Sequence, residues 1–197
     1  MLNISAILLG AGESKRMGKE KLSLPWGKKT IFEHCLRTLL RSRAGEVVVV
    51  LKGPMEEMTL RMRKKKVKVV FNRDYKKGMS ASIRRGIRAL DSKSNGILIG
   101  LGDQPFVKTQ TINALIGAFK KGKGGIIVPS FKGRRGHPVI FHRRYEKELL
   151  RLRGDTGARR IMDRYPHDVW EVPVKSEGVI KDIDTWEDYR KELKIKR

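Results

Sequence analysis

The chain has 197 residues, of which 45 are lysine or arginine and 21 are aspartate or glutamate, so its formal net charge is +24. This length suits one α/β domain with a buried core and is short for two, and we expect a single domain over residues 1–197. No apolar run approaches the ~20 residues that a membrane helix needs, and no charged and then apolar leader stands at the N-terminus. We therefore expect a cytoplasmic protein without a membrane partner.

Apolar runs alternate with helix-period segments along the chain, a pattern typical of successive βα units around a mostly parallel sheet. Strands are predicted at residues 3–9, 46–52, 68–72, 96–101, 125–131, 138–141, 168–174 and 178–182. Helices are predicted at residues 30–42, 80–90, 109–119, 149–152, 157–165 and 185–193. The first three helices each gather their apolar residues on one face, which should pack on the sheet.

Cysteine and histidine are too scarce for a disulfide or a zinc site. Cys35 is the only cysteine, and the four histidines have no further cysteine with which to form a zinc-type cluster, so we expect Cys35 in the core. The many cations are spread along the whole chain with few aromatic residues among them. They predict salt-sensitive binding to any polyanion and no specific nucleic-acid partner.

The first predicted strand breaks into small residues that are followed by cations. Gly10, Ala11 and Gly12 would let the main chain approach an anion closely, and Arg16 and Lys21 can place positive charge against phosphate oxygens. The segment predicts a nucleotide-binding loop, the alternative being a tight turn with solvated cations. It is neither a Walker A loop, because no Lys-Ser or Lys-Thr follows at the required spacing, nor a dinucleotide fingerprint, which needs a third glycine where this chain has a lysine.

A carboxylate stands just past the end of the predicted central strand at residues 96–101. Ligands of open α/β sheets bind at that edge, and a single carboxylate oxygen is a typical ligand of Mg²⁺. We interpret Asp103 as a metal ligand. The alternative is an Asx-turn before Pro105.

A third segment, from Gly78 to Ile83, brings small residues to the start of a predicted helix. Ser80 is the expected N-cap, and the exposed N–H groups there could meet a ribose, a base or a phosphate. The alternative is a simple helix cap.

Six motifs are spread over almost the whole chain: L-x-x-A-G-x-S-x-R-M-G-x-x-K at 8–21, G-M-S-A-S-I at 78–83, D-Q-P at 103–105, G-H-P at 136–138, G-D-x-G-A-R at 154–159 and D-I-D-T-x-E-D-Y at 182–189. In this order they resemble the molybdenum cofactor cytidylyltransferases, within the larger molybdopterin nucleotidyltransferase family. The resemblance implies an α/β fold, namely a Rossmann-like three-layer α/β/α nucleotidyltransferase domain with a mostly parallel mixed sheet.

The resemblance also implies which residues hold the nucleoside triphosphate. The backbone from Leu9 through Gly10 and Ala11 to Gly12 would contact it, with Arg16 and Lys21 on the phosphates. The helix start would approach the base and ribose through Gly78, Ser80, Ala81 and Ser82. Asp103 would hold Mg²⁺ on the triphosphate.

A second metal ligand and an acceptor site are implied in the C-terminal half. The second ligand would be Asp182 or Asp184, with Asp184 preferred, although both could instead cap the helix that begins near Thr185. The acceptor would meet Gly136 and His137 in one segment and Asp155 and Arg159 in another. The alternatives are that a histidine before proline is a turn residue and that the second segment is only a helix entry.

The implied reaction is attack by the terminal phosphate of molybdopterin on the α-phosphorus of CTP, which releases pyrophosphate. Such a transfer needs no protein nucleophile, because catalysis would come from positioning and from charge stabilisation by Lys21, Arg16 and the Mg²⁺ that Asp103 holds. The partner protein would be a molybdoenzyme or its chaperone. The alternatives are transfer of another nucleotide such as GMP, a different phosphorylated acceptor such as a sugar phosphate, and a basic nucleic-acid-binding module.

The chain departs from the family pattern at two points of its first motif. Many relatives carry Ala-Ala-Gly where this chain has Gly10-Ala11-Gly12, a change that keeps the loop function. Glu20 before Lys21 echoes the guanylyltransferase branch, whereas the other segments favour cytidylyl transfer.

Overall fold

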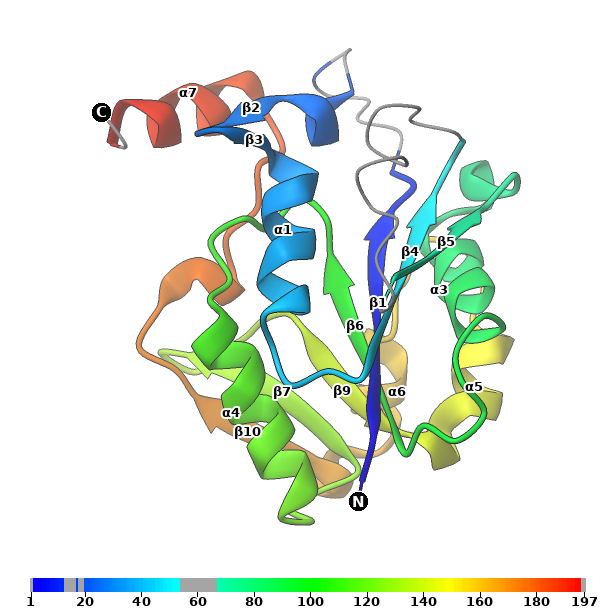
Figure 1. Cartoon of the computed structure of the whole chain (residues 1–197). Helices are drawn as coiled ribbons and strands as arrows, with labels where there is room; N and C mark the ends of the chain where they lie inside the picture. Colours follow the sequence, from blue (N-terminus) through cyan, green and yellow to red (C-terminus); the bar gives the residue numbers. More distant parts are fainter. Residues whose placement is uncertain (1, 13–16, 18–19, 54–66, 196–197) are drawn as a thin grey trace.

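A mixed sheet of eight strands runs through the middle of the molecule (Figure 1). The computed structural model describes residues 2–12, 17, 20–53 and 67–195. The strands of the large sheet are β1 (Ile4–Gly10), β4 (Glu46–Leu51), β5 (Val67–Phe71), β6 (Gly96–Leu101), β7 (Ile126–Phe131), β8 (Arg134–Arg135), β9 (Val139–His142) and β10 (Val169–Pro173). A separate hairpin is formed by β2 (Pro25–Trp26) and β3 (Lys29–Thr30).

Helices fill the connections between the strands. The α-helices are α1 (Ile31–Leu40), α3 (Met79–Ile87), α4 (Thr109–Lys120), α5 (Glu146–Arg151), α6 (Arg159–Arg164) and α7 (Trp186–Ile195). Short 3-10 helices are η1 (Lys21–Ser23), η2 (Tyr75–Lys77), η3 (Arg143–Tyr145), η4 (Pro166–Asp168) and η5 (Glu177–Val179).

The strand order is β10-β7-β9-β6-β1-β4-β5, with β8 paired to β7. Neighbours are parallel except at β9, which runs antiparallel to both β6 and β7, and at β8. All seven residues of β1 are buried, as expected for a central strand that is covered on both faces. The carboxyl ends of β1, β4 and β6 therefore meet at one edge of the sheet.

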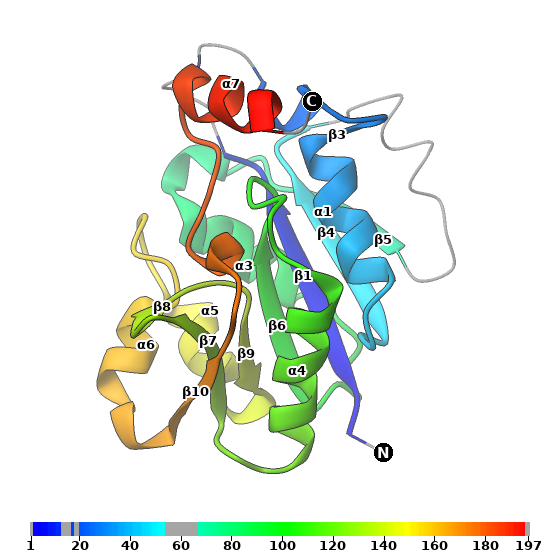
Figure 2. The same cartoon turned by 90° about the vertical axis from the view of Figure 1, so that its left-hand side faces the viewer.

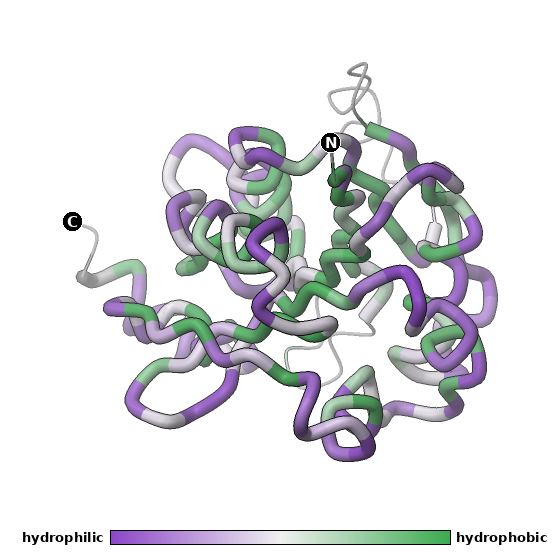
Figure 3. The backbone as a smooth tube through the Cα atoms, turned by 90° about the horizontal axis from the view of Figure 1, so that it is seen from below, coloured by the Kyte–Doolittle hydropathy of each residue, from purple (hydrophilic) through white to green (hydrophobic). Residues whose placement is uncertain are grey.

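The helices cover the sheet in two layers (Figure 2). One face packs against α1 and α4, through a cluster that includes Phe32 and Leu115, and the other packs against α3, α5 and α6, through a cluster that includes Ile83 and Leu149. Figure 3 shows hydrophobic strands inside and hydrophilic segments over much of the periphery. The predicted three-layer α/β/α fold is confirmed.

The C-terminal helix α7 lies over the small hairpin at the carboxyl edge of the sheet (Figure 1). Trp26, Ile31, Ile183 and Tyr189 form a third buried cluster there, and the Tyr189 hydroxyl donates to the Pro25 carbonyl oxygen at 2.7 Å. This packing brings the segment before α7 to the edge where β1 and β6 end. No helix within the described ranges is long and apolar enough to span a bilayer.

Helix α1 shows how the local sequence sets an element's start. Thr30 and Glu33 form a capping box, in which each side chain accepts from the other residue's backbone N–H, at 3.2 and 2.9 Å. Cys35 lies on the buried face of this helix, as expected, and burial raises the pKa of its thiol well above the usual range.

Seven of the predicted strands are present, with ends shifted by at most one residue. The strand predicted at residues 178–182 is wrong, because the chain forms η5 there, with Gly178 N–H donating to the Ser176 hydroxyl. Only the Val179 carbonyl reaches a neighbouring segment in strand-like fashion, accepting from His137 N–H at 2.8 Å. Val179 of this run is buried by loop packing instead, and Ile180 is half-buried.

Candidate active site

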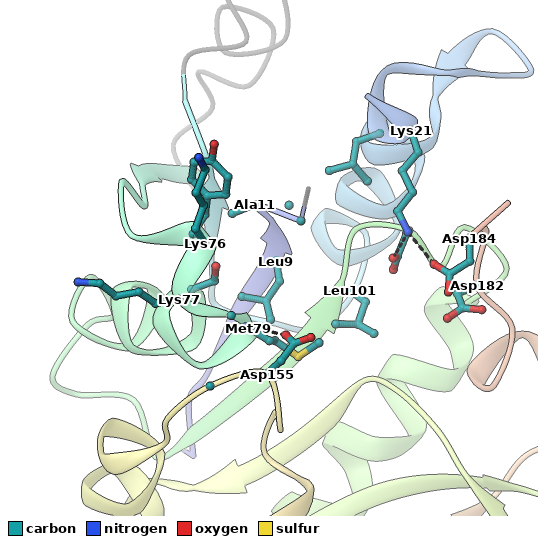
Figure 4. A pocket seen from close by; sticks show the side chains of 18 residues that line it. Leu9, Ala11, Lys21, Lys76, Lys77, Met79, Leu101, Asp155, Asp182 and Asp184 are labelled. Carbon is teal, nitrogen blue, oxygen red and sulfur yellow. Dashed lines mark hydrogen bonds and ion pairs between the residues drawn. The ribbon is translucent and has the colours of Figure 1, made fainter. Parts of the chain in front are cut away.

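A cavity of about 700 Å³ opens at the carboxyl ends of β1 and β6 (Figure 4). Its wall comes from the loop after β1, from η1, from the start of α3 with the preceding η2, and from two segments of the C-terminal half. Both the size and the position at this sheet edge are typical of ligand sites in open α/β folds.

The glycine-rich loop lines the cavity through Leu9, Gly10, Ala11 and Gly12. The backbone is therefore the surface that this wall offers to a ligand, which is the arrangement that suits an anion. Arg16, the first of the two cations predicted to contact phosphates, lies outside the described residues.

Lys21, at the start of η1, contacts two carboxylates on the same side of the cavity (Figure 4). Its Nζ lies 2.7 Å from Asp103 Oδ2 and 2.9 Å from Asp184 Oδ1. Burial opposes the charge of the ammonium, but the two carboxylates outweigh burial and raise the pKa of Lys21 above its ordinary value. Lys21 is thus a fixed positive charge between two negative ones.

The two carboxylates are brought together by the end of β6 and the segment before α7. Ile183 N–H donates to the Asp103 carbonyl oxygen at 3.1 Å, which ties the two segments together. Asp182 also lines the cavity, and burial, followed by the charges of Asp184 and Asp103, raises the pKa of its carboxyl.

The start of α7 is capped by residues other than Asp182 and Asp184, for which capping was the alternative role. The Asp188 carboxylate accepts from Thr185 N–H at 2.8 Å, and the Thr185 hydroxyl accepts from Asp188 N–H at 3.1 Å. This reciprocal pair satisfies the start of the helix. The side chains of Asp182 and Asp184 are left on the cavity wall.

Asp103 and Asp184 suit a hard divalent cation, because an oxygen of each approaches the same point, now held by the Lys21 ammonium. Among the described residues, no three histidine, cysteine, aspartate or glutamate side chains are grouped so as to hold a metal ion by themselves. Two carboxylates would leave the other coordination positions to water and phosphate oxygens, as Mg²⁺ prefers.

The start of α3 differs from the expectation at Ser80. Gly78, with φ +88°, is the N-cap and Met79 begins the helix, so the prediction of Ser80 as N-cap is wrong. Gly78, Met79 and Ser82 line the cavity, whereas Ser80 and Ala81 are buried behind this wall. The N–H groups of Met79 and Ser80 bind Asp155 Oδ1 and the Gly154 carbonyl oxygen, so they are already satisfied by protein atoms.

The residues expected to meet the acceptor are divided between the cavity and its surroundings. Asp155 lines the cavity, and Arg159 is exposed at the start of α6, away from the lining. Gly136 and His137 lie behind the wall, where their N–H groups donate to the carbonyl oxygens of Pro129 and Val179. Burial lowers the pKa of His137, against the opposing charge of Asp103.

The cavity also has lining residues that the motif analysis missed. Tyr75, Lys76 and Lys77 of η2 form part of the wall next to the start of α3 (Figure 4). The signal in the sequence was their position, since they fill the short connection between a parallel strand and the following helix at the carboxyl edge of the sheet.

A family model described as the MobA-like NTP transferase domain matches residues 6–169. The chain therefore belongs to the MobA-like NTP transferase family. It is 32% identical to the purine catabolism protein PucB of Bacillus subtilis, with 93% of this chain and 92% of that protein covered. It is 30% identical to nicotine blue oxidoreductase of Paenarthrobacter nicotinovorans, with 93% of both covered. It is 25% identical to molybdenum cofactor cytidylyltransferase of Escherichia coli, with 96% and 95% covered. The resemblance seen in the motifs is confirmed.

The fold is also similar to solved structures. The crystal structure of Rv0371c from Mycobacterium tuberculosis superposes with a TM-score of 0.83 at 28% identity, with 98% of both chains covered. A structure of the same protein in complex with manganese gives a TM-score of 0.79 at 27% identity, again with 98% of both covered.

Proposed function

We propose that this protein is a cytidylyltransferase that transfers CMP from CTP to the terminal phosphate of molybdopterin and releases pyrophosphate. The observation that carries the proposal is the convergence of Lys21, Asp103 and Asp184 beside a backbone loop at the carboxyl edge of the sheet. A cation between two carboxylates next to a glycine-rich loop suits a metal-bound triphosphate. The molybdenum cofactor cytidylyltransferase of Escherichia coli, similar over 96% of this chain, supports the choice of nucleotide and acceptor.

The nucleotide would lie along the loop from Leu9 to Gly12, with its phosphates toward Lys21 and Arg16. The acceptor phosphate is already ionised at neutral pH, so it can attack the α-phosphorus without a general base. The protein's contribution is then to hold the two substrates in line and to stabilise charge on the departing pyrophosphate. Lys21 can make a charge-assisted hydrogen bond to a phosphate oxygen in place of one carboxylate.

Asp103 and Asp184 would hold Mg²⁺, which when bound withdraws charge from the phosphate oxygens. Their convergence on one point in this structure supports that role, as does the solved manganese complex of the related Mycobacterium tuberculosis protein. Asp182, with its raised pKa, is the neighbouring carboxyl and not the preferred ligand.

The acceptor would enter from the side of Asp155 and Gly154, which line the cavity. One carboxylate oxygen of Asp155 accepts from Met79 N–H, and the other is available to an N–H donor such as those of a pterin ring. Gly136 and His137 do not line the cavity, so they would influence the acceptor only through the segment that they pack against. Arg159 would contact the acceptor from the rim of the cavity. A molybdoenzyme or its chaperone would take up the product.

The direct test is to incubate the protein with molybdopterin, Mg²⁺ and each of the four nucleoside triphosphates in turn. We expect pyrophosphate release and a molybdopterin cytosine dinucleotide, identified by mass, with CTP turned over at least tenfold faster than GTP. Reactions without molybdopterin and with Asp103→Asn are the controls. Faster turnover of GTP would replace cytidylyl by guanylyl transfer, and release only with another phosphorylated acceptor would overturn the choice of molybdopterin.

A further inference from the structure

The turn at residues 152–157 is attached to the first turn of α3 by hydrogen bonds from the N–H groups of the helix. Asp155 Oδ1 accepts from Met79 N–H at 3.0 Å, and the Gly154 carbonyl oxygen accepts from Ser80 N–H at 3.2 Å. At Gly78 a Cβ atom would lie 2.6 Å from the Gly154 carbonyl carbon. The two backbones therefore touch directly, and a side chain at residue 78 would force them apart.

Arg84 adds a third attachment from the next turn of the same helix. Its Nη1 donates to the Leu152 carbonyl oxygen and, at 3.2 Å, to the Ser80 hydroxyl. The Arg84 side chain is half-buried and does not line the cavity. It spans from α3 to the residue where the turn begins, so the turn is held at its beginning by Arg84 and at its middle by the helix N-terminus.

These attachments join two parts of one cavity wall. Gly78, Met79 and Ser82 line the cavity from α3, and Asp155 lines it from the turn (Figure 4). Displacement of the turn would move the Asp155 carboxylate and would also free the N–H groups of Met79 and Ser80. The acceptor side of the wall depends on these hydrogen bonds, whereas α3 on the nucleotide side is also held by the packing of Ile83 and Ile87 on the sheet.

We propose that Arg84 is a positioning residue that holds the 152–157 turn on α3, and thereby fixes the Asp155 carboxylate for binding of the acceptor. Arg84 touches neither substrate and acts through the turn. The assignment of Asp155 to the acceptor rests on the proposed function, whereas the attachment of the turn to α3 does not.

Amide hydrogen exchange tests the attachment without any reaction. The Arg84→Met variant keeps the aliphatic stem and removes the hydrogen-bond donors. We expect hydrogen exchange at the Met79 and Ser80 amides to become at least about tenfold faster, because opening of the turn no longer requires the Arg84 hydrogen bonds to break. The exposed Arg88, the C-cap residue of α3, supplies the matched control, Arg88→Met, which should leave both amides unchanged. Arg84→Lys keeps the charge with a different donor geometry and should give an intermediate rate. Unchanged exchange in both Arg84 variants, with the fold intact by circular dichroism, overturns the proposal.

Steady-state kinetics test the consequence for the acceptor. Arg84→Met should raise the KM for molybdopterin at least about fivefold, the effect of one lost hydrogen bond, while the KM for CTP and kcat change less than about twofold. Equal increases in the two KM values would overturn the selective effect on the acceptor. If the wild-type protein does not transfer CMP to molybdopterin, the proposed function fails, and the exchange experiment still decides whether Arg84 holds the turn.

Discussion

Two clusters of carboxylates and cations lie at opposite edges of the same sheet. At the carboxyl edge, Lys21 bridges Asp103 and Asp184. At the other edge, Asp168 Oδ1 accepts from Gly125 N–H at 2.9 Å, and its Oδ2 accepts from Arg144 and the Tyr145 hydroxyl. Each cluster pairs aspartate with a cation, and both join segments that are far apart in the chain.

Exposure of the aspartates does not distinguish the two clusters, although Lys21 is 11% exposed and Arg144 is 55% exposed. The side chains of Asp103, Asp184 and Asp168 are 24%, 25% and 28% exposed. The difference lies in what surrounds them, since Asp103 and Asp184 border a 700 Å³ cavity and Asp168 is fastened to a backbone N–H at the start of β7. A half-buried ion pair therefore indicates a binding site only together with the space beside it.

The largest difference in activity is expected between two variants, each with one carboxylate of its cluster replaced by an amide. Asp103→Asn should lower Mg²⁺-dependent turnover by at least about a hundredfold, with nucleotide affinity in the absence of metal nearly unchanged, because a neutral amide holds the cation poorly. Asp168→Asn should leave turnover within about twofold, since it touches only structural partners. Measurement of kcat for both variants tests the comparison, and a fully active Asp103→Asn enzyme would remove Asp103 from the metal site.

The same exchange separates the two candidates for the second ligand. We expect a severe defect in Asp184→Asn and a mild one in Asp182→Asn, because Asp184 shares the Lys21 contact with Asp103. The reverse order would assign the ligand to Asp182.

Loss of a cation should have the next largest effect. Lys21→Ala and Arg16→Ala should each slow transfer at subsaturating CTP at least about tenfold, because each removes a charge-assisted contact worth ~1.5–3 kcal/mol. Lys68→Ala is the control, since Lys68 pairs with Glu46 at the other edge of the sheet. Normal turnover in the Lys21 or Arg16 variant would exclude that residue from the phosphate site.

The Asp168 cluster should affect stability, in a way that depends on pH. Burial opposes ionisation of Asp168, but hydrogen bonds from Arg144, Tyr145 and Gly125 outweigh it and lower the pKa of the carboxyl. A lowered pKa contributes stability above the unfolded value of about 3.9, and this contribution is lost as the pH falls through the folded value. Asp168→Asn should therefore reduce the free energy of unfolding by about 1–3 kcal/mol at pH 7 and by less at pH 3, as measured by urea denaturation. An equal loss at both pH values would contradict this origin.

The smallest effect on activity is expected from the dispersed charge. Replacing Lys64, Lys65 and Lys66 together by serine should reduce the salt dependence of RNA or DNA binding and leave cytidylyl transfer unchanged. These residues lie outside the described part of the chain. Tight binding of one RNA at physiological salt that is lost in this variant would favour a nucleic-acid-binding function instead.

Much of the fold could be predicted from the local sequence pattern, and the predictions that were wrong have local causes. The buried strands β1 and β6 are continuous apolar runs, which the sequence displays directly. The apolar residues at 178–182 looked equally strand-like, but they pack as an irregular segment, and the two-residue strands of the small hairpin are too short to leave a pattern. Ser80 was expected to cap α3, whereas the cap is a glycine whose φ is positive.

Individual residues of the candidate site could be predicted from the sequence, but their contacts with one another could not. The position of Asp103 after a central strand indicated the correct sheet edge. That Lys21 Nζ would lie within 3 Å of both Asp103 and Asp184 depends on the packing of α7 on the small hairpin, which joins residues more than 160 positions apart. Likewise, His137 has a strong motif signal but lies behind the wall, because its N–H pairs with Val179.

The ring of Phe32 packs against Gly10, which lines the cavity, and against Gly102, which precedes Asp103, and these contacts restrict which residues can replace the glycines. The atoms nearest to a Cβ at Gly10 would be side-chain atoms of Phe32 and, at 3.0 Å, of Leu51, so a smaller residue at position 32 makes room for alanine at position 10. A Cβ at Gly102 would lie 2.8 Å from the Leu9 carbonyl oxygen as well as 2.6 Å from the Phe32 ring, and backbone cannot shrink. Positions 10 and 32 should therefore covary in volume among homologues, and the Ala-Ala-Gly loops should accompany a residue smaller than phenylalanine, whereas position 102 stays glycine.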